Sequence, residues 1–431
     1  MLTLALVAGC VLQGPPPPRL RPRAIIDVPS FAPEIGAFSP AHDVFVHIDA
    51  CWRTLEVYQL RWSNPMEPPT LVALDLDEDR PGIQGRPFAT TPTSVAAHPT
   101  VPVAIVSSVG RFVEEPGQVT AIDLRPQTLG QTLWTQGVGH HPDSVAISPD
   151  GRWLVVANEG EGDSRASVAP GSVSVVKLAG TDLLAHRRFH GALESWQLDV
   201  HEGLALDAGE VEPEYVAFDP GSRFALVTCQ ENDGAVVIDL GGPEPKVGAK
   251  VFLPKGSEPD GCAVLDGYTD PTFGPGCLIA LAEEGKFDEQ GRWLGQSVSF
   301  HWLGPEGLWS KSVLLSRLDV AAAVGQSGKE TCPESVLLKR VGEHTLAFVG
   351  IERAHQILEI DVTDPRAPRT AGSARVGKRP EGLLWVEHGG VVWIVSCDEG
   401  DDGPGEVSFL SVTAAGAPQP AAGRRASAPA R

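Results

Sequence analysis

The stretch PDSVAISPDGRWLVVANEGEG at residues 142–162, followed by GSVSVVKL at residues 171–178, decides the fold. The segment Ser-Val-Ala-Ile-Ser is too short for a helix, and Pro149-Asp150-Gly151 is a turn sequence. The two segments that follow are rich in β-branched residues, and the last one alternates. The stretch therefore predicts three short antiparallel strands of one small sheet.

The same pattern recurs seven times along the chain, each time opening with a proline that an acidic residue follows in all copies but one. The copies begin at Pro33-Glu34, Pro92-Thr93, Pro142-Asp143, Pro213-Glu214, Pro259-Asp260, Pro333-Glu334 and Pro380-Glu381. One such sheet cannot bury both of its faces alone, whereas sheets packed radially can. We therefore predict an all-β fold, a single seven-bladed β-propeller of four-stranded antiparallel blades.

The ring is predicted to close through the N-terminal segment. A fourth, outer strand follows the third in most copies, but after the seventh copy the segment 405–412 runs into residues 413–431, which are rich in Ala, Pro and Gly. The apolar segment 23–28 precedes the first copy and is free to supply the missing outer strand, which leaves no open sheet edge. We expect the propeller to span residues 23–412 and residues 413–431 to be disordered.

The first residues predict export. Residues 1–9 are apolar or small, too few to span a bilayer but suited to a signal peptide. Val7-Ala8-Gly9-Cys10 resembles a lipobox, so Cys10 is the predicted lipidation site and residues 10–22, with four consecutive prolines, a tether. The expected location is the cell envelope, lipid-anchored at the outer membrane or cell surface, with the lipid as the only membrane contact.

The charge excludes one class of partner. The formal net charge is −21, which opposes binding to the phosphates of nucleic acid. No phosphate-binding glycine loop or dinucleotide motif occurs in a supporting context, so no nucleotide cofactor is expected. An acidic surface favours cations or basic partners.

Several runs together resemble the choice-of-anchor I family. They are VANEGEGD (156–163), VEPEYVAF (211–218), TCQENDGAVVIDL (228–240), EPDGCAV (258–264) and RPEGLLWV (379–386). The resemblance covers residues 23–412. It implies a secreted propeller with a variable anchor, and it implies no particular biochemical activity.

Acidic residues recur at two places in the blade that lie on one face of a propeller. The first place is the position after each proline: Glu34, Asp143, Glu214, Asp260, Glu334 and Glu381. The second is the loop between the second and third strands: Glu159, Glu231, Glu284, Glu352 and Glu399. Hard oxygen ligands in that number suit Ca²⁺ or another divalent cation. The alternative is that each acid accepts backbone hydrogen bonds or faces water. His140 and His141 could join a metal site beside Asp143, although such pairs in turns are usually inert.

Apart from Cys10, the chain holds six cysteines, an even number that permits disulfides in an exported protein. Cys51 and Cys397 belong to blades that meet at the closure, and Cys229 and Cys262 belong to blades four and five. These are the candidate pairs, and buried free thiols are the alternative. The long spacings after Pro142 and Pro259 predict excursions at 181–209, 266–276, 286–296 and 316–330, which are often functional.

The function these features favour is a non-enzymatic surface module, a monomeric disc that presents an acidic face to an envelope component, a peptide or a small ligand. The competing hypothesis is a metal-dependent hydrolase of phosphate esters or lactones that uses the same acidic face. The sequence names neither a catalytic residue nor the ligand.

Overall fold

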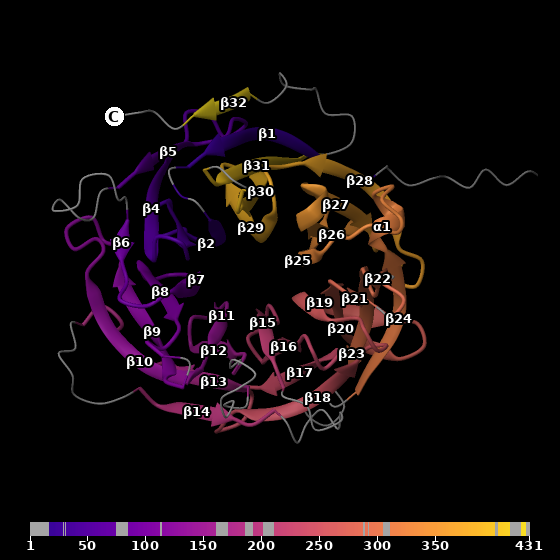
Figure 1. The fold of residues 1–431 in the computed structure, drawn as a ribbon, viewed down its shortest axis with the longest axis horizontal. Coiled ribbons are helices and arrows are strands. Elements are labelled where there is room, and N and C mark those ends of the chain that lie inside the picture. The colour runs from indigo at the N-terminus through magenta and orange to yellow at the C-terminus, as the bar shows by residue number, and fades with distance from the viewer. Residues whose placement is uncertain are drawn as a thin grey trace, which may run out of the picture.

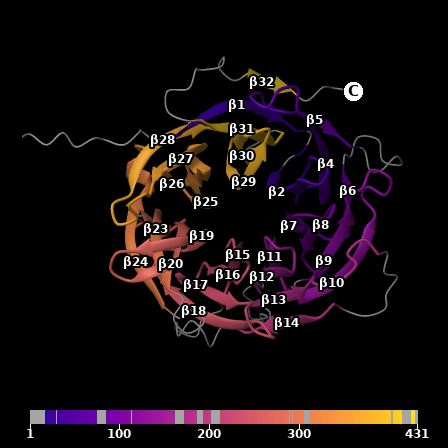
Figure 2. The same ribbon diagram turned by 180° about the vertical axis from the view of Figure 1, so that it is seen from behind.

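The computed structural model describes residues 17–28, 30, 32–74, 85–112, 114–160, 171–185, 193–200, 211–287, 289–291, 293–304, 311–400, 404–413 and 424–427. They form a ring of seven antiparallel sheets around a central axis (Figures 1 and 2). The predicted all-β, seven-bladed β-propeller is therefore confirmed.

The blades follow one another in chain order, each with its first strand innermost (Figure 1). Blades one to three are β2 (Pro33–Ser39), β3 (Val44–Asp49), β4 (Thr54–Arg61) and β5 (Thr70–Ala73), with β6 (Arg86–Pro87) also paired to β4; β7 (Pro92–Ala97), β8 (Val103–Ser108), β9 (Pro116–Asp123) and β10 (Thr132–His140); and β11 (Pro142–Ile147), β12 (Trp153–Asn158), β13 (Ser172–Lys177) and β14 (Ser195–Leu198).

Blades four to six are β15 (Pro213–Phe218), β16 (Phe224–Cys229), β17 (Gly234–Asp239) and β18 (Lys246–Phe252); β19 (Pro259–Asp270), β20 (Gly274–Glu283), β23 (Ser297–Gly304) and β24 (Lys311–Asp319); and β25 (Pro333–Val341), β26 (His344–Ile351), β27 (Gln356–Asp361) and β28 (Arg369–Arg375). A hairpin of β21 (Lys286–Phe287) and β22 (Trp293–Leu294), the helix α1 (Val320–Ala323) and the 3-10 helix η2 (Glu352–Ala354) decorate blades five and six. Among the described residues, no helix has the length and apolar character needed to cross a membrane.

Blade seven is built from both ends of the chain. The strands β29 (Pro380–His388), β30 (Val391–Asp398) and β31 (Glu406–Thr413) continue into β1 (Arg19–Asp27), which pairs antiparallel with β31 from Arg19↔Thr413 to Asp27↔Glu406. This pairing confirms the predicted closure by an N-terminal outer strand. A further strand, β32 (Arg424–Ser427), within the segment expected to be disordered, pairs parallel with β1.

The core is divided among the seven interfaces between neighbouring blades, with one apolar cluster in each. The middle strands are buried on both faces, as in β8, β12 and β16, because each blade packs against a neighbour on either side. At the closure, Trp393 of blade seven and Tyr58 of blade one are almost completely buried in one cluster with Ile26 of β1. Burial of apolar surface between blades therefore holds the ring together.

Every one of the seven inner strands begins at the proline that the repeat places there. Each proline pairs with the last or nearly last residue of the second strand, and the pairing register then shifts within the next three residues. Such a bulge interrupts the regular alternation of side chains between the two faces of the strand and changes the direction of the side chain that follows the proline. The repeat thus positions seven equivalent side chains at the axis.

The cysteines do not form the predicted bonds. The six that the structure describes are free thiols, so neither Cys51–Cys397 nor Cys229–Cys262 is bridged. Cys51 is exposed in a turn, whereas Cys397 is buried against blade one, where a Cβ atom placed on Gly36 would lie 2.7 Å from its sulfur. The two side chains face different surroundings, and five of the six thiols follow the alternative of buried free cysteines.

Two of the four predicted excursions are regular structure. Residues 266–276 continue β19 and β20 as one long hairpin, and the segment 286–296 contains the β21–β22 hairpin. The segment 316–330 holds the end of β24 and α1. Within 181–209 the structure contains β14, while 186–192 and 201–209 lie outside the described residues.

Candidate functional site: an acidic cavity on the axis

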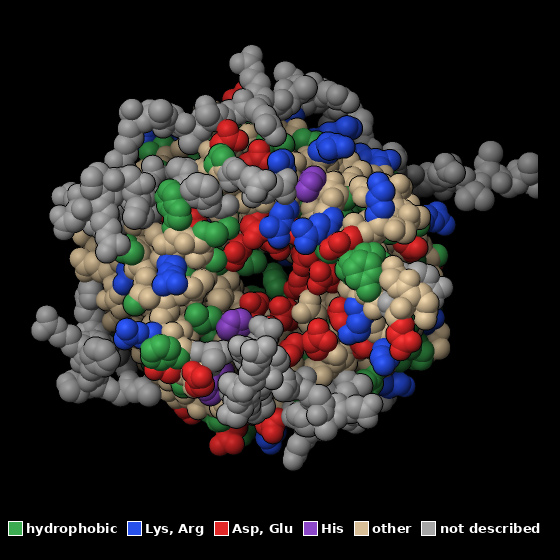
Figure 3. Space-filling model, in the orientation of Figure 1, with side chains coloured by type: hydrophobic (Ala, Val, Ile, Leu, Met, Phe, Trp, Pro, Cys, Tyr) green, Lys and Arg blue, Asp and Glu red, His purple; other side chains and the backbone are tan. Residues whose placement is uncertain are grey.

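The residues that follow the seven prolines meet in one cavity of about 330 Å³. Its lining contains all seven of them, and it adds Glu284 and Glu399 from the loops between second and third strands. In the space-filling view Asp and Glu side chains gather around the central opening (Figure 3). Among the residues that the structure describes, the cavity lining holds eight carboxyl groups and no Lys, Arg or His. The two predicted acidic positions therefore do lie on the same face of the disc.

The loop residues are held in place by one repeated backbone hydrogen bond. The amide of Glu159 donates to the carbonyl of His141 at 2.9 Å, and the amide of Glu399 donates to that of Arg379 at 2.9 Å. Equivalent bonds occur in blades two, four, five and six, always to the carbonyl of the residue before the inner-strand proline. Each of these blades thus presents three adjacent positions to the rim: before the proline, after the proline, and in the loop.

This repeat corrects one predicted site residue. In blade four the amide that donates to the carbonyl of Glu212 belongs to Gln230, and Gln230 lines the cavity. Glu231, one residue later, lies outside the cavity, and its half-exposed carboxylate is 3.5 Å from Nζ of Lys286. Glu159 and Glu352 also lie beside the cavity rather than in its lining. The loops therefore contribute two of the five predicted carboxyl groups directly.

Crowding and burial keep the cavity carboxyls protonated to unusually high pH. Burial raises the pKa of Glu34 to about 8, with smaller contributions from the charges of Glu399 and Asp143. Burial and the neighbouring Glu159 raise the pKa of Asp143 to about 7, against a smaller effect of His141. Carboxyls that resist ionisation in this way gain most from a cation placed among them.

In the next three blades the effect is stronger. Burial raises the pKa of Glu214 well above its usual range, as do Asp143 and Glu159 nearby. The carboxyls of Asp260 and Glu334 share a hydrogen bond, which requires that one of them carries the proton. The pKa values of both are raised well above the usual range, chiefly by burial.

Glu214 carries an unmet hydrogen-bonding demand. Its Oε2 atom is buried and has no hydrogen-bond partner among the residues that the structure describes. A buried carboxyl oxygen without a partner is costly, and native proteins rarely leave one unsatisfied. Because Glu214 lines the cavity, the missing partner belongs inside it.

Elsewhere on the rim the protein supplies its own positive charge. Arg379, the residue before the proline of blade seven, lies 2.5 Å from Oε1 of Glu352 through Nε and 2.5 Å from Oε2 of Glu399 through a terminal nitrogen. In blade three Nδ1 of His141 lies 2.5 Å from Oε2 of Glu159. Sequence reasoning missed the position before the proline, apart from His141, because its residue type varies from blade to blade.

Two groups of side chains are close enough to share one metal ion, with all ligand atoms of a group within 4.8 Å of one another. One is Glu352, Glu381 and Glu399, which Arg379 already bridges. The other is Glu284, Cys332 and Glu334. The arrangement can bind a cation through oxygen ligands, and on one side of the cavity through a sulfur as well.

Fold and site together define the class of this protein, a seven-bladed β-propeller with an acidic cavity on its axis. Residues 37–246 match the Choice-of-anchor I domain, which confirms the resemblance seen in the sequence. The match runs from blade one into blade four and assigns a Choice-of-anchor I domain to that part of the β-propeller. The lipidation predicted at Cys10 lies outside the described residues.

Solved structures share the fold at low sequence identity. Hydrazine synthase of Kuenenia stuttgartiensis is 13% identical, with a TM-score of 0.58 over 90% of this chain and 97% of that one. The periplasmic gluconolactonase PpgL of Pseudomonas aeruginosa is 17% identical, with a TM-score of 0.51 over 84% of this chain and 96% of that one. None of the curated proteins matches the chain.

Proposed function

We propose that the protein is an exported surface-interaction module whose axial cavity binds a divalent cation. The observation that carries the proposal is the cavity itself, whose described lining residues include eight carboxyl groups and no basic side chain. The unpartnered oxygen of Glu214 supports it independently, because a bound cation supplies what that atom lacks. Neutralising several crowded carboxyls with one ion also removes their mutual repulsion.

Calcium is the ion that the main part of the cavity favours. Ca²⁺ takes six to eight oxygen ligands in flexible geometry, and carboxylates are its usual partners. Mg²⁺ demands a tighter octahedral arrangement and keeps several of its waters. A ring of carboxyls from separate blades offers many oxygens and no strict geometry, which suits Ca²⁺.

The choice-of-anchor I match supports an exported, surface-attached protein. We infer that Cys10 carries the anchoring lipid and that the acidic face points away from the membrane toward an envelope component, a basic peptide or a small cationic ligand. In this hypothesis the bound ion reduces the repulsion among the carboxyls around the axis.

The test is calorimetric titration of metal-stripped protein with Ca²⁺, Mg²⁺ and Mn²⁺. We expect saturable heat on addition of Ca²⁺. Glu214→Gln should weaken the affinity for Ca²⁺ at least about tenfold, because the substitution removes the charge of one coordinating carboxylate. Glu231→Gln is the matched control, the same change just outside the cavity, and it should leave the affinity unchanged. Silent titrations with all three ions would overturn the proposal.

One further assay separates the module from the competing hydrolase. The Ca²⁺-loaded protein is assayed with lactone and phosphomonoester substrates, since a metal in a carboxylate cavity can polarise such carbonyl and phosphoryl oxygens. A module gives no turnover above that of buffer with Ca²⁺. Turnover that Glu214→Gln abolishes and Glu231→Gln retains would replace the module with the hydrolase.

A further inference from the structure

The rim position before each inner-strand proline decides how the carboxyls around it are neutralised. In blade seven this residue is Arg379, whose guanidinium reaches the loop carboxyl of its own blade, Glu399, and that of the preceding blade, Glu352. The backbone of Arg379 has a positive φ of 57°, a conformation uncommon outside glycine. The protein thus holds a cation at this point of the ring.

One blade earlier the same position is occupied by Cys332. Its backbone has a similar φ of 45°, and the amide of Glu352 donates to its carbonyl at 2.9 Å, as the amide of Glu399 donates to that of Arg379. Cys332 therefore occupies in blade six the position that Arg379 occupies in blade seven. A neutral thiol stands where the next blade has a guanidinium.

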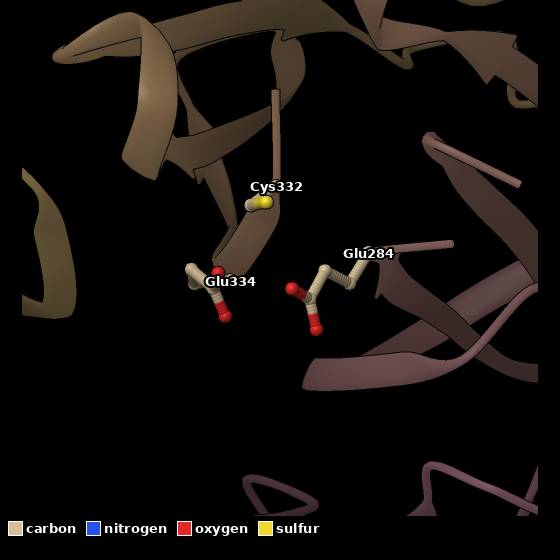
Figure 4. Close-up of side chains that lie close together, drawn as sticks. All are labelled: Glu284, Cys332 and Glu334. Atoms are coloured by element: carbon tan, nitrogen blue, oxygen red, sulfur yellow. The ribbon is translucent and has the colours of Figure 1, made fainter. Parts of the chain in front are cut away.

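The carboxyls around Cys332 correspond to those around Arg379. Glu284 is the loop carboxyl of the preceding blade, and Glu334 follows the proline of the same blade. The sulfur and a carboxylate oxygen from each lie within 4.8 Å of one another. In the close-up the two carboxyl groups point toward each other across a gap, with the sulfur beside it (Figure 4).

The guanidinium of Arg353 lies beside this group and is shared with other carboxylates. Arg353 contacts the side chain of Cys332, but its Nε lies 3.1 Å from Glu352 and 3.4 Å from Glu330. The Cys332 thiol also points to Oε1 of Glu330 at 3.4 Å. Because Glu284 and Glu334 line the cavity, the gap between them opens toward the axis.

A second observation at this side of the cavity points to a ligand. The buried Oε2 of Glu214 has no partner among the described residues, and its charge interacts with Glu334. The carboxyl of Asp260 is hydrogen-bonded to that of Glu334 and so lies next to the group of Glu284, Cys332 and Glu334. Two carboxylates and one sulfur therefore converge, with Asp260 hydrogen-bonded to one of them, at a side of the cavity whose described lining residues include no Lys, Arg or His.

We propose that Glu284, Cys332 and Glu334 bind a thiophilic divalent cation of the zinc type, with Asp260 as the fourth donor. This inference rests on the proposed function, that the cavity takes up a divalent cation, and adds a sulfur ligand and a metal class to it. Zinc is usually four-coordinate and accepts thiolate and carboxylate donors together, whereas Ca²⁺ has little affinity for sulfur. On binding, the S–H bond of Cys332 breaks, its proton passes to solvent, and the sulfur's electron pair forms the metal–sulfur bond. No oxidation or reduction takes place.

Cobalt is the probe, because Co²⁺ occupies zinc sites and a cobalt–thiolate bond gives a charge-transfer absorption band. Titration of the metal-stripped full chain with Co²⁺ should develop this band with one equivalent, and Zn²⁺ should displace it. Cys332→Ser should abolish the band and weaken Zn²⁺ binding by about 100-fold, since a ligand atom is lost. Cys51→Ser, which removes the exposed thiol, should leave both unchanged.

The calorimetric Ca²⁺ titration of the same variants separates this inference from the proposed function. If Ca²⁺ binds and Glu214→Gln weakens it, but no Co²⁺ band appears in the wild type, the cation cavity stands and the sulfur site is wrong. A band that persists in Cys332→Ser overturns the sulfur site in the same way. Should Cys332→Ser misfold, Glu284→Gln provides the second variant: a weakened band supports the site, and an unchanged one refutes it.

Discussion

The carboxyl of Glu34 should make the folded protein less stable as the pH rises from 4.5 to about 8. Burial and the charges of Glu399 and Asp143 raise the pKa of Glu34 from 4.5 to about 8 in the folded protein. A raised carboxyl pKa means that the folded state binds the proton more tightly than the unfolded chain does. The stability it contributes is complete below pH 4.5 and is lost as the pH rises through about 8.

The magnitude follows from the same interval. At about 1.4 kcal/mol per pH unit, the interval from 4.5 to about 8 gives an upper bound of about 5 kcal/mol. Glu34 is only half-buried, so water screens part of this penalty, and we expect about 2–3 kcal/mol. Glu34→Gln removes the ionisation altogether. The stability that the variant gains over wild type at high pH, about 2–3 kcal/mol, corresponds to about 2–4 °C in melting temperature for a chain of this size.

The assay is scanning calorimetry of wild type and Glu34→Gln at pH 5, 7 and 9 in the presence of a chelator. The melting temperature of the variant relative to wild type should rise between pH 5 and pH 9, and an excess of Ca²⁺ should reduce the difference. Glu231→Gln, which changes a carboxyl outside the cavity, should show no such trend. A wild-type-to-variant difference that is equal at pH 5 and pH 9 would refute the electrostatic reasoning.

Three further changes test the ring itself. Arg379→Met should lower the free energy of unfolding by about 2 kcal/mol at neutral pH, measured calorimetrically, because it leaves two rim carboxylates without their shared cation. Gly36→Ala should cost about 1–3 kcal/mol in a urea titration, since its new Cβ would meet the sulfur of Cys397 at 2.7 Å; Gly137→Ala, with nothing within 4 Å, should be close to neutral. Ile26→Ala should cost about 2–4 kcal/mol in the same titration by emptying part of the core under the closing strand, and an unchanged midpoint would contradict its role there.

The repeat predicts the architecture well because its proline has a fixed structural meaning. Proline lacks an amide donor and restricts its own backbone, so it is tolerated at the first residue of a strand, and all seven inner strands begin there. The position after each proline could therefore be assigned to the axis from the sequence. The N-terminal closing strand was likewise predictable, because only one apolar segment remained for the last blade.

The rim loops were harder to predict because their geometry depends on a tertiary hydrogen bond. Nothing in the run Gln230-Glu231 says which side chain faces the axis; the backbone bond to Glu212 decides it. The proximity of Cys332 to Glu284 was not predictable from the sequence either, because the two residues belong to different blades and meet only when those blades pack together. A comparison of the residues before the seven prolines was the one signal that could have revealed it.

The pairing of β1 with β31 has a consequence for how the molecule is made. Arg23 in β1 donates to the hydroxyl of Ser411 in β31, a contact between residues separated by 388 positions. During synthesis the first strand emerges long before its partner, so six blades can stack while the seventh still lacks both its inner three strands and its seam. Until the final blade is made, the apolar faces of blades one and six that it covers have no neighbour within the chain and can contact other chains.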